Sequence, residues 1–250
     1  MSVLACYLED EGIATTLVSL VRLHSEKVEP PRALWVPFEL GRPLGLPNNP
    51  TLQTAVLKAA LSLLDLAEGP VVLEDFDHPT TETEPLDGWQ SPVKTAPTDL
   101  DPSDVVAFKA ALDAEIALAT PWYDGAAATS GRTVFGVSNM TMEQISQHLT
   151  SFLTDTPDDS PVADFSPRMA LRFGADDLKV FYLEAAMAEE ETPSSAQLVG
   201  WFWRETVAGQ LLIALRERMM KSDDDKLKVI GGGFIVPGAK VAELNLYRAP

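Results

Sequence analysis

Three short apolar segments near the start of the chain limit the folds that it can adopt. They are residues 13–21 (IATTLVSLV), 32–38 (RALWVPF) and 70–76 (PVVLEDF). Apolar, β-branched runs of this length are typical of buried strands. Between the second and third segments, apolar residues recur at helical spacing over about 51–67. The sequence therefore predicts a small sheet flanked by helices.

The link between the first two strands leaves their relative direction open. Only ten residues, RLHSEKVEPP, separate them. A parallel crossover usually needs about a dozen residues or more. The two strands are therefore either parallel, with a one-turn helix between them, or antiparallel. A further helix is predicted before the first strand, over about 2–11, and ends at Gly12.

Helix signals dominate the chain after residue 101. Capping residues and apolar periodicity predict helices that begin near Asp104, at Thr141, at Asp176 and at Ser194 or Ser195, the last running over about 196–221. Short strands are expected at 132–138 and 234–237. The predicted fold is mixed α/β (α+β), with a small, largely parallel or mixed sheet flanked by helices and a mainly helical C-terminal half.

Composition divides the chain into three parts. Residues 1–78 form an α/β segment, 79–101 an acidic, proline-rich linker loop, and 102–250 a mainly helical part expected to pack on the same sheet. One compact domain is favoured over two, because the later strands are expected to join this sheet.

Charge and cysteine content exclude several classes of function. The chain has 19 basic and 37 acidic residues, a net charge of −18. This charge argues against partners that are nucleic acids or anionic membranes. There is no apolar stretch long enough to cross a membrane, and the N-terminus lacks the basic flank of a signal peptide. With a single cysteine, the sequence predicts a cytoplasmic protein.

A resemblance to a known family covers about residues 8–61. The matching residues are Leu8, Glu9, Gly12, Ile13, Arg32, Gly41, Pro43, Gly45, Pro47 and Gln53. This segment resembles the C-terminal segment of the B-component family of glycine, sarcosine, betaine and D-proline reductases. In that family a selenocysteine or cysteine at the end of a strand, just before the helix that matches 2–11, carries out the redox chemistry. The sequence given begins at that helix, so the resemblance implies an oligomeric enzyme in which a second protein subunit completes the active site.

Candidate catalytic residues follow the first two predicted strands. Arg42, in the loop ELGRPLGLP, could hold a carboxylate or phosphate of a small-molecule substrate, and Glu39 could orient it. His24 could act as a general base. The alternative interpretations are a rigid structural turn for the loop and a solvated histidine for His24.

Substrate-binding and metal-binding candidates complete the set. The substrate candidates are Arg32, Gly41 and Gly45 from the resembling segment, and Trp201 from a helix with aromatic residues on two faces. Acidic residues and one histidine at the end of the third strand could hold a divalent metal, namely Glu74, Asp75, Asp77 and His78. A solvated loop is the alternative there, and no cofactor is certain.

Three functions remain open from the sequence. The leading one is a subunit of a multi-subunit cytoplasmic enzyme that resembles the reductase B component. The second is a cofactor-independent or metal-assisted hydrolase, or a hydrolase subunit, that cleaves an activated C–O, C–N or C–S bond. The third is a non-catalytic assembly protein.

Overall fold

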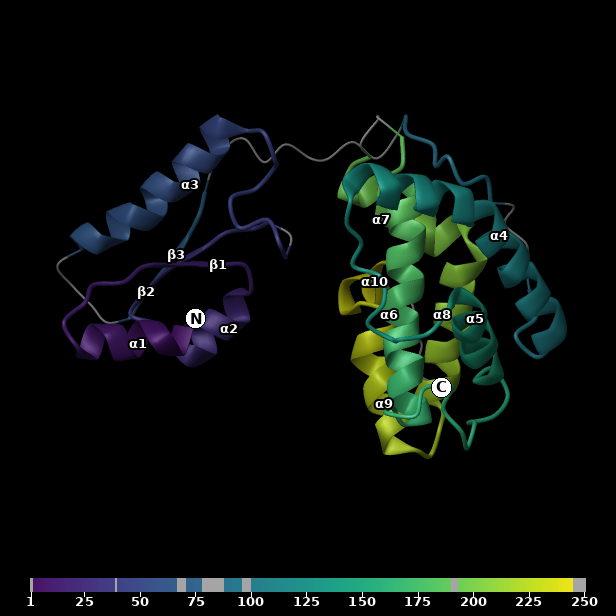
Figure 1. Cartoon of the computed structure of the whole chain (residues 1–250). Helices are drawn as coiled ribbons and strands as arrows, with labels where there is room; N and C mark the ends of the chain where they lie inside the picture. Colours follow the sequence, from purple (N-terminus) through teal and green to yellow (C-terminus); the bar gives the residue numbers. More distant parts are fainter. Residues whose placement is uncertain are drawn as a thin grey trace. The chain divides into compact units, whose positions relative to one another are not determined.

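The computed structural model divides the chain into two compact units, Met1–Thr83 and Glu84–Pro250 (Figure 1). It describes residues 2–38, 40–66, 71–77, 88–95, 100–189 and 193–244, apart from the side chains of 239, 242 and 243. The mixed α/β class is confirmed, with helices dominating the C-terminal half. In place of the single compact domain that the sequence favours, each unit has its own hydrophobic core.

The first unit, unit 1, contains a three-stranded sheet in the order β1-β2-β3. Its elements are α1 (Ser2–Asp10), β1 (Leu17–Ser19), α2 (Arg22–Val28), β2 (Arg32–Trp35), α3 (Pro50–Ser62), the 3₁₀ turn η1 (Leu63–Asp65) and β3 (Val72–Asp75). Both strand pairs are parallel. The short link after β1 therefore crosses over through α2, which settles the alternative that the sequence left open.

The core of unit 1 lies between the sheet and α3. Its buried members are Leu34, Val36, Val56, Ala60 and Leu63. β1 is shorter than the predicted strand 13–21, because the N–H of Thr15 donates to the carboxylate of Glu9 at 2.5 Å instead of to a neighbouring strand. β2 ends before Pro37, which has no N–H to continue the ladder.

The second unit, unit 2, is a helical bundle. Its elements are α4 (Val105–Ser130), α5 (Met142–Ser151), α6 (Pro167–Ala186), α7 (Ser195–Glu205), α8 (Val207–Met220), α9 (Asp225–Ile230), the π-helical turn η2 (Gly231–Ile235) and α10 (Gly238–Glu243). α6 packs against α4, α5, α7 and α8 (Figure 1). Among the fully buried side chains that fill this core are Phe108, Leu112, Phe152, Leu171, Leu178, Tyr182, Leu211 and Leu212. No helix in the described ranges has both the length and the apolar character that a membrane span requires.

Helix starts were predicted with mixed success. Thr141 and Ser194 each form a capping box at the start of α5 and α7, as expected. The prediction that Asp176 begins a helix is wrong. α6 begins ten residues earlier, where Ser166 accepts a hydrogen bond from the N–H of Met169 and Pro167 opens the first turn.

Two predicted elements of unit 2 have other structures. Residues 132–138 form a loop rather than a strand, because three of their N–H groups donate to the carboxylate of Asp177. The predicted helix 196–221 is two helices, divided at Thr206, whose backbone is extended and whose hydroxyl caps α8. In place of the predicted strand at 234–237, the chain ends the π-helical turn η2 at Ile235.

Candidate functional site

The carboxyl ends of the three parallel strands meet at one edge of the sheet in unit 1. Ser19 pairs with Trp35, and Trp35 pairs with Asp75. The segments that follow these residues are α2, the loop 36–49 and residues 76–77. Ligands of open parallel sheets bind at this edge. We call these three segments the carboxyl-edge site.

Residues 40–49 of this loop are held in a defined shape by their own contacts. Gly41 and Gly45 have φ angles of +94° and +82°, which side chains rarely adopt. A Cβ at Gly45 would lie 2.7 Å from the Cδ2 of Leu52, so the buried side chain of Leu52 would have to shift to admit it. The N–H of Gly45 donates to the carbonyl of Arg42 at 2.9 Å, which closes a turn around the arginine.

Arg42 lies at this turn with its side chain half-buried. Its predicted neighbour Glu39 lies outside the described residues. Asn49 then caps α3 by accepting from the N–H of Leu52 at 3.0 Å. The loop therefore fixes the arginine between the end of β2 and the start of α3.

A charged bridge links the ends of the two outer strands. The Nε of Arg22 donates to Asp75 at 3.0 Å, and the same guanidinium also pairs with Glu26. His24 lies on α2 beside this bridge in sequence, and its side chain is exposed. The structure thus places Arg22, His24, Arg42 and Asp75 on the segments of one sheet edge.

The structure describes only part of the predicted metal site. Asp75 is paired with Arg22, and Asp77 is exposed. His78 lies outside the described residues. Within the described ranges, no three His, Cys, Asp or Glu side chains come together as a metal-binding group.

Arg32 lies at the amino end of β2, away from the carboxyl-edge site. Its guanidinium pairs with Glu9 at 2.6 Å. Hydrogen bonds from the N–H of Thr15 and from Arg32 hold the pKa of the Glu9 carboxyl below its ordinary value. The geometry therefore gives Arg32 a contact that joins α1 to the sheet.

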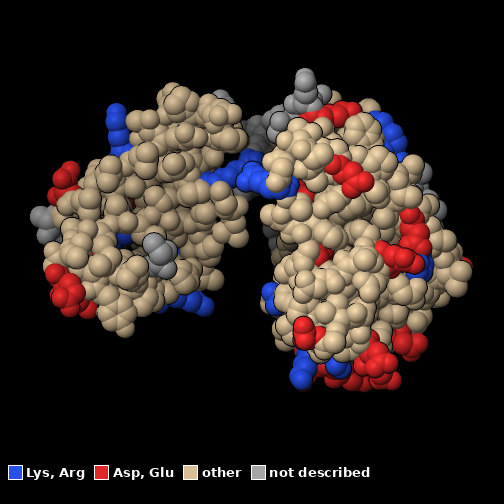
Figure 2. Space-filling view, viewed as in Figure 1, with Lys and Arg blue, Asp and Glu red and all other residues tan. Residues whose placement is uncertain are grey.

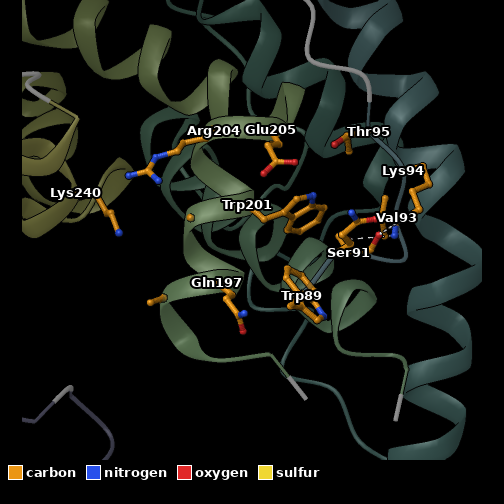
Figure 3. Close-up of a pocket in the computed structure, with 13 residues that line it drawn as sticks. Trp89, Ser91, Val93, Lys94, Thr95, Gln197, Trp201, Arg204, Glu205 and Lys240 are labelled. Carbon is orange, nitrogen blue, oxygen red and sulfur yellow. Dashed lines mark hydrogen bonds between the residues drawn. The ribbon is translucent and has the colours of Figure 1, made fainter. Parts of the chain in front are cut away.

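Trp201 lies in unit 2, where it lines a cavity of about 830 Å³ (Figure 3). Trp89 lies beside it, with its ring centroid 6.3 Å from that of Trp201 at an interplanar angle of 89°. Trp89 is not among the predicted site residues, because the composition of 79–101 is typical of a linker loop. A large aromatic residue in a polar, proline-rich segment was the signal that could have found it.

Comparison of the chain with protein-family models, with curated proteins and with solved structures gives no match. The resemblance over residues 8–61 therefore stays an expectation from the sequence pattern. Functional inference for this chain depends on the geometry of the carboxyl-edge site and of the cavity beside Trp201.

Proposed function

We propose that the chain is a subunit of a multi-subunit enzyme, and that it binds the carboxylate group of a small substrate at the carboxyl-edge site. The observation that carries the proposal is the parallel register of β1, β2 and β3, which gathers Arg22, His24, Arg42 and Asp75 at one edge. The resemblance to the reductase B-component family supports a cytoplasmic enzyme that completes its active site with a second subunit.

The roles of the residues follow from their chemistry. A guanidinium presents a planar pair of donors that matches a carboxylate. Arg42 is therefore the group that we expect to hold the substrate, at a turn fixed by Gly41 and Gly45. The bridge between Arg22 and Asp75 joins the start of α2, which follows β1, to the end of β3 at the same edge of the sheet.

The surface of unit 1 supports a partner subunit. Within the described residues, β1 and β3 each pair with one strand only, so each leaves an edge unpaired. α1 and α3 also expose large apolar side chains, namely Val3, Leu4, Tyr7, Leu57 and Leu61. On the viewed face of this unit, charged side chains lie mainly at the margins (Figure 2). Unpaired strand edges and exposed apolar side chains are features that a second protein can cover, which favours a partner subunit here.

Native mass spectrometry of the protein purified from its source cells tests the subunit proposal. We expect a stable complex with a second gene product. In a parallel activity assay, only that complex should convert the substrate that binds at the carboxyl-edge site. Full turnover by the isolated chain, or a chain that is monomeric under the same conditions, would overturn it.

Calorimetric titration of the purified complex tests the carboxyl-edge site. The probes are glycine, sarcosine, betaine and D-proline, which all carry the carboxylate that Arg42 is proposed to hold. We expect Arg42→Ala to weaken binding of the preferred probe by about tenfold or more, the loss expected from one charge-assisted contact. Lys58→Ala, at an exposed position on α3, is the matched control. Equal affinities of the two variants would contradict the site.

A further inference from the structure

The cavity beside Trp201 lies wholly within unit 2, so it is independent of the function proposed for unit 1. Three segments line it, namely residues 89–95, α7 and α10. Its volume of about 830 Å³ falls within the range of about 300–1,000 Å³ that is typical of small-molecule sites. The cavity is therefore large enough for a ligand of several rings.

Two tryptophans give the cavity an aromatic corner. Trp201 is 5% exposed, and its ring contacts Tyr182 on the core side. Trp89 meets Trp201 nearly at a right angle. A planar ring in the cavity can lie against the half-buried indole of Trp89, while Trp201 forms the buried back of the corner. Stacked and edge-on arrangements are both favourable for aromatic groups.

Basic side chains surround this corner. Lys94 lies on one side of Trp201, and Arg204 and Lys240 lie on the other (Figure 3). Lys94 is held by a hydrogen bond from its Nζ to the carbonyl of Ser91 at 3.0 Å. Among the described lining residues, Glu205 is the one acidic side chain. The lining is thus basic, whereas the whole chain carries a net charge of −18.

We propose that this cavity binds a small planar aromatic anion, such as an aromatic carboxylate. The ring of the ligand stacks on the half-buried indole of Trp89 beside Trp201, and its anionic group meets the guanidinium of Arg204 and the ammonium of Lys240. The same tryptophans could attract a cation, but the basic lining would repel it. An uncharged ring would make the aromatic contacts but would not be attracted by the basic side chains.

Isothermal titration calorimetry with 1-naphthoate, and with its uncharged analogue 1-naphthamide, tests the proposal on the full chain. We expect 1-naphthoate to bind about tenfold tighter or more, because charge-assisted hydrogen bonds add to the aromatic contacts. Its affinity should also fall as salt is raised. Equal affinities for the two compounds, or no binding of either, would overturn the proposal.

Substitutions locate the site. The double variant Arg204→Gln and Lys240→Gln should lose the preference for 1-naphthoate while keeping the affinity for 1-naphthamide. Trp89→Ala should weaken the binding of both compounds. Lys226→Gln, on α9 and outside the cavity lining, is the matched control for removal of a positive charge. An unchanged preference in the double variant would show that the anion binds elsewhere on the chain and would overturn the assignment.

Discussion

Asp177 shows how a single side chain decides the structure of a segment 40 residues away. Its buried carboxylate accepts hydrogen bonds from the N–H groups of Gly136, Val137 and Ser138, at 2.9, 3.1 and 2.9 Å. The hydroxyl of Ser138 adds a fourth bond at 2.5 Å. A buried carboxylate requires such partners, because the desolvation of an unpaired charge is costly. The loop 132–138 therefore curls around Asp177, although its β-branched sequence is typical of a strand.

His148 should make the stability of the protein depend on pH. Burial lowers the pKa of its imidazole below the ordinary value of 6.5, partly offset by a hydrogen bond with the carbonyl of Pro167. The unfolded chain then binds a proton more readily than the folded protein. The stability that neutral His148 contributes is complete above pH 6.5 and is lost as the pH falls from there through the lowered pKa.

Urea unfolding at about pH 7.5 and 5.5 measures this effect. Because one proton is involved, the free energy of unfolding can change by at most about 1.4 kcal/mol per pH unit. His148→Gln should reduce the loss of stability on acidification. His24→Gln, at an exposed position, is the control. Identical slopes in the wild type and in His148→Gln would contradict the assignment.

At the scale of elements, the junction of α7 and α8 leaves no room for a side chain at Gly209. A Cβ there would lie 2.2 Å from the carbonyl oxygen of Phe202, and a backbone atom cannot move aside as the end of a flexible side chain can. Gly209→Ala should therefore lower the free energy of unfolding by about 1–3 kcal/mol or more. Gly125→Ala, at an exposed position of α4 with nothing within 4 Å of the added Cβ, should raise it by about 0.5–1 kcal/mol. Denaturant titration measures the free energy of unfolding of both variants. Equal changes in the two would contradict the prediction.

The elements that could be predicted from the sequence are those determined by local signals. Thr141 and Ser194 cap their helices through side chains within three residues, and α3 follows from the spacing of its apolar face. The missed start of α6 had a local signal in Ser166 and Pro167, but other errors arise where a distant residue decides. Asp177 prevents the predicted strand, and Glu115 binds the N–H groups of Val207 and Ala208 at the start of α8. No pattern within a short window contains these contacts.

The candidate site was predictable to a similar extent. The glycine- and proline-rich loop of Arg42 and the cluster around Asp75 were found from their positions after predicted strands. Their convergence on one edge required the parallel direction of the strands, which a ten-residue link left open. The pairing of Arg32 with Glu9, and that of Arg22 with Asp75, depended on tertiary contacts that the sequence does not reveal.

At the scale of the whole molecule, two separate cores predict two unfolding transitions. Leu212 is fully buried in unit 2, and Val56 is fully buried in unit 1. Leu212→Ala should destabilise its own unit by about 2–5 kcal/mol and leave the other transition in place. Val56→Ala should shift only the transition of unit 1. Differential scanning calorimetry measures both, and a single transition shifted by either variant would refute the prediction.

The bond between Glu115 and the start of α8 also has a consequence for biosynthesis. Glu115 and Val207 are 92 residues apart in the chain. At about 5–20 residues per second, the ribosome needs about 5–20 s to make the residues between them. Throughout that interval Glu115 on α4 has no α8 to bind, because the N–H groups that it accepts from have not yet been made. The α/β unit, whose residues are made first, can finish folding before the last helices of the bundle have been synthesised.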